Sequence, residues 1–345
     1  MKKLMVMVAA LAMITSSAYA ADWNFYGSAR ISTFYVNTDT ISTTTEKDNY
    51  EQALQGNARI GAKVKVSDEL TGRFEYGAAG GNANIRLLYG EWNFGAGSFL
   101  VGQDYAPLNW FYSDQVFDGD ADLLPYGGVY SGRVGQLKLT FGGFQVALVP
   151  AGVSTTGVAA TSTEVKIPGI EAAYVLNLDN FALKFGGGYQ TYEAQVGART
   201  FDIDSYVVAL GAQANFGAFY AGGNVYTGQN AGNLISIDVD GGRTWNDGVA
   251  VLSATQVVDN EVWGAMIAAG YKVNDMFNIE AGYGYVKTEL DNAANTENQV
   301  DSYYLNTTVT LAPGVFFVPE IGRIDGDEAN DFEVTYYGVK WQINF

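Results

Sequence analysis

The sequence predicts an all-β fold, a transmembrane antiparallel β-barrel of sixteen strands. Three observations predict it. Apolar and polar residues alternate along many successive segments, the connections between these segments alternate between long and short, and the last segment ends on an aromatic residue. Period-two alternation is typical of strands with one apolar and one wetted face. Because element boundaries taken from one sequence are inexact, fourteen or eighteen strands also fit the pattern.

The first twenty residues predict a secretory signal peptide. Two lysines precede an apolar run at 4–14, and the small-residue site Ala18-Tyr19-Ala20 follows. The run is too short to span a membrane as a helix, and it leads directly into a cleavable motif. We expect cleavage after Ala20, which makes residues 1–20 the signal peptide and residues 21–345 a single barrel domain.

Composition narrows the class of protein. The chain has 23 Tyr, 19 Phe and 42 Gly but 6 Pro, as expected for many aromatic-edged strands joined by tight turns. It lacks cysteine and histidine, which removes disulfides, thiol chemistry, Ser-His nucleophiles and the commonest metal ligand. No acidic cluster has the spacing of an EF-hand loop. We therefore predict no enzyme activity, no catalytic residue, no metal site and no cofactor. The alternative for the cluster Asp325-Gly326-Asp327 with Asp331 and Glu333 is a weak divalent-cation site that bridges to anionic lipopolysaccharide.

Net charge excludes a further class. The full chain carries a formal charge of −18, and removal of Lys2 and Lys3 leaves 17 basic against 37 acidic residues, which gives −20. A chain this acidic repels the phosphate backbone and is a poor candidate for nucleic-acid binding.

The first two predicted strands separate their apolar and polar residues onto opposite faces. In segment 22–36 one face carries Trp23, Phe25, Ala29 and Ile31, and the other Asn24, Tyr26, Ser28 and Arg30. In segment 53–66 the apolar face carries Leu54, Ala58, Ile60, Ala62, Val64 and Val66, and the polar face Asn57, Arg59, Lys63 and Lys65. The polar run 37–51 predicts a long loop between them, and Ser67-Asp68-Glu69 predicts a tight turn after them.

The later segments show the same alternation of tight turns and long connections. Tight turns are predicted near 67–69, 95–97, 142–143, 178–180, 217–218, 274–275 and 313–314. Longer connections are predicted at 37–51, 79–84, 105–128, 150–169, 192–202, 228–260, 288–299 and 325–331. Together they require sixteen strands and place both chain ends on one side of the membrane. A barrel of about sixteen strands leaves an aqueous channel, whereas eight strands would fill their interior with side chains.

The last predicted strand spans residues 332–345. One of its faces carries Tyr337, Val339, Trp341, Ile343 and Phe345, and a lipid-facing strand has aromatic residues at both edges of its apolar band. This end resembles the terminal strand of bacterial outer-membrane β-barrels. The resemblance implies that an assembly signal, formed by Tyr337, Trp341, Ile343 and Phe345, is read by barrel-assembly machinery. The alternative is an amphipathic edge strand of a soluble β-sandwich, because such sandwiches also alternate.

The connection 105–128 mixes acidic with large apolar residues. Its acids are Asp114, Asp118, Asp120 and Asp122, and its large apolar residues are Leu108, Trp110, Phe111, Phe117, Leu123 and Leu124. A loop in water has little reason to carry so many large apolar groups, so we expect it to fold inward onto the barrel wall. It resembles the third long loop of the Gram-negative general porins, which implies carboxylates at the narrowest point of the pore. The alternative is an exposed loop with solvated acids.

Cations are predicted opposite those acids. Arg30, Arg59, Arg73 and Arg86 occur one per strand on the first four strands, each on the face that alternation assigns to the lumen, and Lys63 adds a further cation. The segment from Arg86 to Gly95 resembles the fourth strand of porins, in which an arginine of the constriction precedes an aromatic, a glycine and a turn. Neighbouring guanidiniums need water and counter-charge around them. The alternative is that they are rim charges or pair with loops.

The resemblance to the homotrimeric general porins implies a function. It implies an outer-membrane channel for the passive diffusion of small hydrophilic solutes and ions, with two further copies of the chain, outer-membrane lipid, lipopolysaccharide and the assembly machinery as partners. The acidity of the chain predicts a mild cation preference. Two alternatives are a substrate-selective channel for a sugar or an anion, and a structural barrel with a closed lumen.

Overall fold

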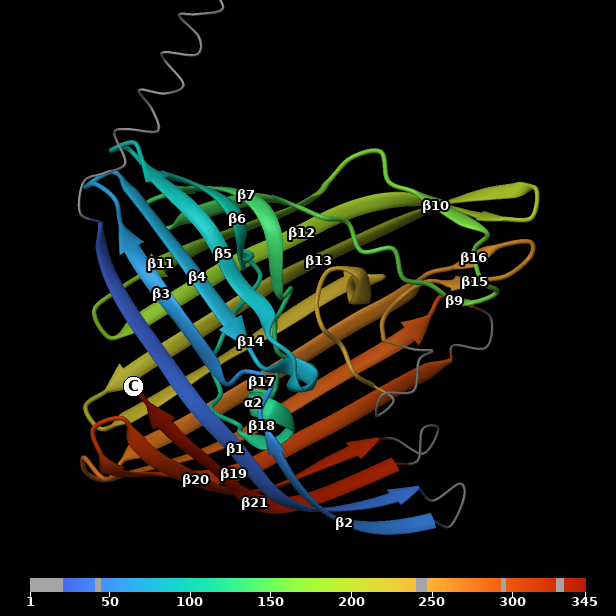
Figure 1. Cartoon of the computed structure of the whole chain (residues 1–345). Helices are drawn as coiled ribbons and strands as arrows, with labels where there is room; N and C mark the ends of the chain where they lie inside the picture. Colours follow the sequence, from blue (N-terminus) through green and yellow to red (C-terminus); the bar gives the residue numbers. More distant parts are fainter. Residues whose placement is uncertain (1–20, 41–44, 240–246, 293–295, 327–331) are drawn as a thin grey trace, which may run out of the picture.

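The computed structural model describes residues 21–40, 45–239, 247–292, 296–326 and 332–345. The predicted signal peptide, residues 1–20, lies outside them. The chain forms one closed antiparallel barrel, and loops fill part of its interior (Figure 1). In the part of the chain that is described, no helix has the length and hydropathy of a membrane span.

The barrel wall is one continuous sheet of eighteen segments. In chain order they are β1 (Asp22–Thr40), β2 (Thr45–Leu54), β3 (Arg59–Lys65), β4 (Leu70–Gly77), β5 (Asn84–Asn93), β6 (Ser98–Tyr105), β7 (Arg133–Phe141), β8 (Phe144–Val149), β10 (Ser162–Glu164), β11 (Gly169–Asn177), β12 (Phe181–Val196), β13 (Arg199–Phe216), β14 (Phe219–Gln229), β17 (Asn260–Lys272), β18 (Phe277–Leu290), β19 (Glu297–Ala312), β20 (Val315–Gly326) and β21 (Phe332–Asn344). A second, three-stranded sheet lies in the loops and comprises β9 (Thr156–Gly157), β15 (Val251–Leu252) and β16 (Val257–Val258). The helical turns are η3 (Ala79–Gly81), α2 (Phe117–Asp120) and η4 (Ala231–Asn233).

Two wall positions are shared by interrupted strands, which brings the eighteen segments to sixteen wall strands. β2 and β3 both pair with β1, through Ile31↔Leu54 and Ser28↔Arg59, and they are separated by residues 55–58. β10 and β11 likewise both pair with β12. β1 closes the barrel by pairing with β21 from Ser28↔Asn344 to Thr40↔Phe332. The predicted sixteen-stranded antiparallel barrel is confirmed.

The seven predicted tight turns all join neighbouring wall strands. The shortest turns place a glycine at positive φ, as at Gly217 (φ 63°) and Gly314 (φ 78°), a conformation that side chains with a Cβ rarely adopt. Elsewhere a side chain closes the turn: Asn274 Oδ1 accepts the main-chain N–H groups of Met276 and Phe277. These short connections set the register of each hairpin at its turn.

Two of the predicted long loops are wrong in length. Where 37–51 was expected to be loop, β1 continues to Thr40 and β2 begins at Thr45; where 192–202 was expected to be loop, β12 continues to Val196 and pairs directly with Arg199 of β13. The physical reason is that both faces of a hairpin above the membrane are wetted, so a polar sequence continues the ladder as well as an alternating one. The tall β12–β13 hairpin projects beyond its neighbours at the right of Figure 1.

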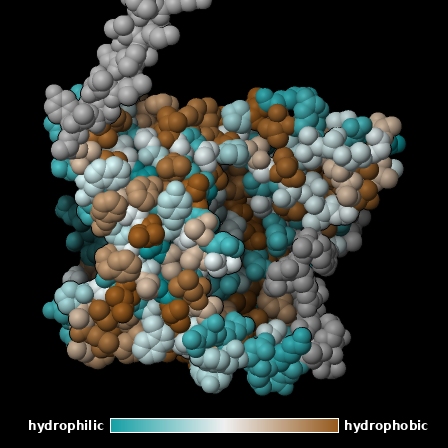
Figure 2. Space-filling model, in the orientation of Figure 1, coloured by the Kyte–Doolittle hydropathy of each residue, from teal (hydrophilic) through white to brown (hydrophobic). Residues whose placement is uncertain are grey.

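The outside of the wall is apolar and aromatic. In β1, Trp23 and Phe25 are 53% and 68% exposed, while Ser28 on the opposite, lumen-facing side is buried. Figure 2 shows apolar side chains over the wall and a polar group at the lower edge, where the β1–β2 hairpin ends. The predicted assembly-signal residues follow the same pattern, because Tyr337, Trp341, Ile343 and Phe345 are all about half exposed or more.

Candidate functional site

Loop L3, residues 106–132 between β6 and β7, folds into the barrel as predicted. Figure 1 shows α2, which belongs to this loop, inside the ring of strands. Leu108 and Leu123 are fully buried and Trp110 is 2% exposed. Phe117 stacks on Tyr336 of β21 with ring centroids 3.7 Å apart. Because these side chains are packed against the wall, L3 is fixed in the lumen and does not extend into solvent.

Three buried wall carboxylates hold the main chain of L3. Glu171 of β11 accepts the N–H of Leu108 at 3.0 Å, and Glu280 of β18 accepts that of Asp114 at 2.6 Å. Glu320 of β20 accepts the N–H of Val116 at 2.7 Å and of Phe117 at 2.9 Å. Through these bonds the wall fixes the backbone of L3 at three points along the loop.

These wall carboxylates are functional residues that the sequence analysis missed. Each is the only acid on the inner face of its wall strand, and this is the signal that could have found them. Their partners lie far away in sequence, with 166 residues separating Asp114 from Glu280. Which inward position meets which part of L3 depends on barrel curvature, and alternation does not encode that.

Arginines of the first strands gather on a buried acid, Glu75 of β4. Its carboxylate lies 2.7 Å from Arg86 Nε, 3.1 Å from Arg73 Nη2 and 3.6 Å from Arg59 Nη1. The hydroxyl of Tyr26 also donates to it at 2.8 Å. This shared counter-charge lets three guanidiniums lie side by side. The arginines were predicted from the sequence, but Glu75 was not, although it lies two residues after Arg73 on the same strand face.

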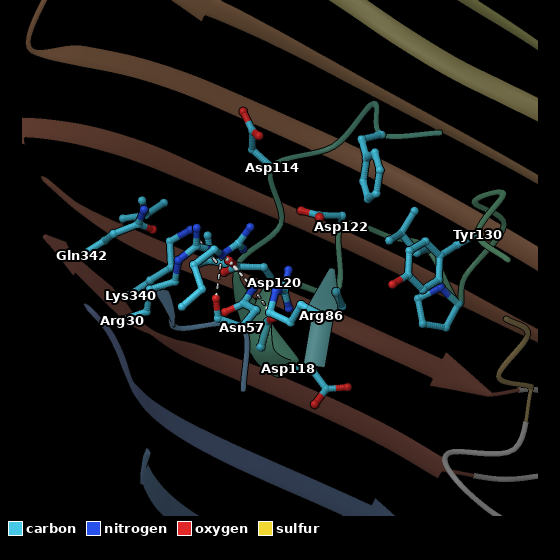
Figure 3. A pocket seen from close by; sticks show the side chains of 18 of the residues that line it. Arg30, Asn57, Arg86, Asp114, Asp118, Asp120, Asp122, Tyr130, Lys340 and Gln342 are labelled. Carbon is cyan, nitrogen blue, oxygen red and sulfur yellow. Dashed lines mark hydrogen bonds and ion pairs between the residues drawn. The ribbon is translucent and has the colours of Figure 1, made fainter. Parts of the chain in front are cut away.

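A second ion-pair cluster joins L3 to the wall through Asp120. Arg30 Nη1 lies 2.6 Å and Lys340 Nζ 3.1 Å from its carboxylate, and Asn57 Nδ2 donates to it at 2.8 Å. Figure 3 shows these three side chains gathered on Asp120, with Asp114 and Asp122 farther along the loop. Lys340 was missed, although alternation places it on the inner face of the last strand.

The backbone around Asp120 is strained. Asp118, Asp120, Asp122 and Leu123 all have positive φ, between 49° and 65°. A backbone with positive φ is unfavourable for residues that have a Cβ, so they adopt it only where surrounding contacts stabilise it. The ion pairs of Asp120 and the burial of Leu123 supply those contacts, so the acids of L3 are held in a defined arrangement.

The acids of L3 and the cations of the barrel strands line one cavity, whose volume is about 570 Å³. Its acids are the predicted Asp114, Asp118, Asp120 and Asp122, and its cations are Arg30, Arg59, Arg86, Arg133 and Lys340. Two residues that were predicted for the constriction, Arg73 and Lys63, do not line this cavity in the described structure. Arg73 instead contacts Tyr26 and Glu75, and Lys63 is exposed elsewhere on β3. Arg133 was missed, since it is the first residue of β7 and lies beyond the segment 105–128.

Burial alters the titration of the L3 acids. It raises the pKa of Asp122 well above the usual range, and the nearby carboxylates of Asp120 and Asp114 add to this effect. Burial also raises the pKa of Asp114 and of Asp118, although the ammonium of Lys340 partly opposes this at Asp114. These acids therefore begin to lose negative charge at a higher pH than ordinary surface acids do.

A second loop braces L3 from the other side. Loop L6, residues 230–259 between β14 and β17, places buried Leu234, Ile235 and Ile237 in the same apolar cluster as Leu108 and Trp110. Its main-chain N–H groups at Ser236 and Asp238 donate to the carbonyls of Tyr130 and Pro125 at 2.8 and 3.1 Å. L6 corresponds to the long connection predicted at 228–260, which was not assigned to the lumen. Its described part packs against L3 inside the barrel.

Comparisons with known proteins agree with this architecture. A sequence model described as Gram-negative porin matches residues 8–329. No curated protein sequence matches the chain. Among solved structures, the outer membrane channel DcaP of Acinetobacter baumannii covers 94% of this chain and 97% of its own length, with 18% identity and a TM-score of 0.75.

Two further solved structures resemble the barrel. The anion-selective porin from Comamonas acidovorans is 13% identical over 94% of this chain and 100% of its own, with a TM-score of 0.60. The trimer form of in-vitro folded OmpT from Vibrio cholerae is 18% identical over 95% and 100%, with a TM-score of 0.58. At these identities the likeness concerns the fold.

Proposed function

This chain belongs to the Gram-negative porin family, and from that premise we propose that the cavity between L3 and the arginine wall is the constriction of its pore. The protein is an outer-membrane channel for passive diffusion of small hydrophilic solutes, and its family and fold are those of a channel rather than an enzyme. One observation carries the proposal: four acids of L3 and five cations line the same cavity of about 570 Å³ in the lumen.

Opposed charges across a narrow aqueous passage produce a transverse field. Dipolar solutes orient in such a field, and cations and anions follow separate sides. Five cations and four acids line the cavity, and the raised pKa of Asp122 further weakens the negative charge of the acids. We therefore infer that the constriction itself favours anions, while the acidic surface of the chain favours cations at its mouths.

Reversal potentials in a salt gradient test the constriction. The double variant Asp114→Asn/Asp118→Asn should raise the anion share of the current, and Arg59→Gln/Arg86→Gln should raise the cation share. Both effects should shrink as the salt approaches 1 M, where the Debye length is about 3 Å. Lys63→Gln is the matched control, because Lys63 is an exposed cation outside the cavity. If both double variants behave like the control, the cavity is not on the permeation path.

The barrel has a proposed oligomeric state and membrane environment. We propose a homotrimer, by likeness to the trimer form of OmpT, with outer-membrane lipid and lipopolysaccharide around it. We further propose cleavage after Ala20, a single barrel domain at 21–345, and recognition of the aromatic terminal strand by the assembly machinery. The outward exposure of Trp341 and Phe345 supports that last role.

A selective channel is the second candidate, and one observation favours it over a structural barrel. Arg133 lines the cavity, and none of the ion pairs in the described structure includes it. A guanidinium with free donors in an aqueous passage is available to an anionic solute.

A further inference from the structure

Three aromatic side chains form a continuous edge on one side of the cavity. Tyr105 ends β6, and Phe111 and Tyr130 belong to L3; all three line the cavity. The Tyr105 and Phe111 rings meet edge to face with centroids 5.4 Å apart, and those of Phe111 and Tyr130 are 6.0 Å apart. The edge-to-face geometry fixes the rings relative to one another.

Phe111 differs from every other large apolar residue predicted to anchor L3. It is 47% exposed, whereas Leu108, Trp110 and Leu123 are almost completely buried. Apolar surface left in water costs about 25 cal/mol for each Å² that burial would have removed. A passage that sorted solutes by size and charge alone would gain nothing from this exposed ring. The exposed part of the Phe111 ring faces the cavity and is accessible to a solute there.

Two guanidiniums flank these rings. Arg133 Nη1 donates to the Tyr105 hydroxyl at 3.2 Å, and its guanidinium carbon lies 5.4 Å from the centre of the Tyr105 ring. Arg86 Nη2 lies 3.5 Å from the same hydroxyl. The two arginines are not equivalent, because Arg86 is held by Glu75 whereas Arg133 has no carboxylate partner among the described residues. Arg133 therefore has N–H groups free for a carboxylate.

We propose that Tyr105, Phe111, Tyr130, Arg86 and Arg133, named here the aromatic corner, form a binding subsite for aromatic monocarboxylates. The carboxylate binds Arg133, and the flat ring of the solute lies on Phe111. This inference deepens the proposed function and rests on the cavity being on the permeation path. A volume of about 570 Å³ lies within the usual range for small-molecule sites, about 300–1,000 Å³.

Current recordings from single channels in planar bilayers test this subsite, with benzoate as the probe. Acetate carries the charge without the ring, and benzamide carries the ring without the charge. We expect benzoate to interrupt the salt current in a concentration-dependent manner, with an apparent affinity about tenfold above that of either control, as one charge-assisted contact contributes. Equal effects of benzoate and acetate would overturn the proposal.

Substitutions in the aromatic corner distinguish binding of benzoate at this site from a general attraction of anions to the lumen. Arg133→Gln and Phe111→Ala should each weaken the benzoate block about tenfold while the channels still conduct, and Arg133→Lys should recover part of it. Lys63→Gln should leave the block unchanged.

If Phe111→Ala has no effect, the arginine attracts anions without a ring subsite, and the inference fails while the constriction stands. If a neutral sugar blocks the current and benzoate does not, the corner is a sugar platform and the inference also fails. If the wild-type protein conducts no current, the proposed function fails first.

Discussion

The carboxylate of Glu320 on β20 accepts the main-chain N–H of Val116 at 2.7 Å, and so anchors the middle of L3 to the opposite wall. The same carboxylate accepts the N–H of Phe117 and the side-chain amide of Asn306. The wall therefore holds the middle of L3 by its main chain as well as by the ion pairs of Asp120. Cavity-lining acids such as Asp114 and Asp118, which form none of the described ion pairs, can change selectivity without removing these anchors.

Removal of this anchor should loosen L3 without unfolding the barrel. Glu320→Ala leaves two buried N–H groups without acceptors, at a cost of about 1–3 kcal/mol each, while the strand ladder stays intact. We expect larger and noisier single-channel currents at an unchanged yield of folded protein. Glu261→Gln is the control, because Glu261 is an exposed acid on the wall strand β17. Currents identical to those of the wild type would show that Glu320 does not position L3.

Glu75 should govern the charge of the arginine wall. In Glu75→Gln the guanidiniums of Arg59, Arg73 and Arg86 lose their shared counter-charge, so the lumen becomes more positive. We expect a larger anion share of the current and a lower temperature of barrel unfolding, measured by reversal potential and by heat-modified gel mobility. Glu69→Gln, in an exposed turn, should change neither quantity.

The raised pKa of Asp122 predicts pH-dependent selectivity. An acid with a raised pKa binds its proton at a higher pH than a surface acid does, so its negative charge is present above that pKa and is lost as the pH falls through it. As the pH is lowered toward the range in which surface carboxylates titrate, the anion share of the current should therefore rise before those surface carboxylates are protonated. Asp122→Asn should reduce this change. An equal pH dependence in the variant would assign the titration to other groups.

The chain terminus should matter for assembly more than for conduction. The main chain of Phe345 pairs with Gly27 in both directions, and its ring lies against that glycine on the outer surface. Phe345→Asp places a charge at the membrane interface and should lower the amount of barrel assembled in the outer membrane, measured on unheated gels of membrane fractions. Those barrels that do assemble should conduct normally. Asn344→Asp is the control at the adjacent position.

The strands and tight turns of the barrel wall could be predicted from the sequence, but the contacts between the wall and L3 could not. Alternation and glycine turns are local signals, so Trp23, Phe25 and Gly217 are placed correctly from their neighbours. The apolar residues of L3 also indicated its inward fold, because Leu108 and Trp110 have no reason to be in water. The anchors Glu75 and Glu320 depend on distant partners that barrel curvature brings together, and no short-range pattern predicts them.

The hairpins at 37–51 and 192–202 show a second limit. Above the membrane a strand no longer needs an apolar face, and the alternation that identifies strands disappears while the hydrogen-bond ladder continues. The extent of a barrel beyond the membrane is therefore underestimated from hydropathy.

The central claim, that L3 and the arginine wall form the constriction, can be tested by thiol modification, because the wild-type chain has no cysteine. Asp118→Cys places one thiol in the cavity, and Asp68→Cys places one on an exposed turn outside it. A bulky anionic methanethiosulfonate reagent added during single-channel recording should reduce the current of Asp118→Cys in discrete steps and leave that of Asp68→Cys unchanged. If mass spectrometry confirms that Asp118→Cys is labelled and its current does not change, solutes do not pass between L3 and the arginine wall.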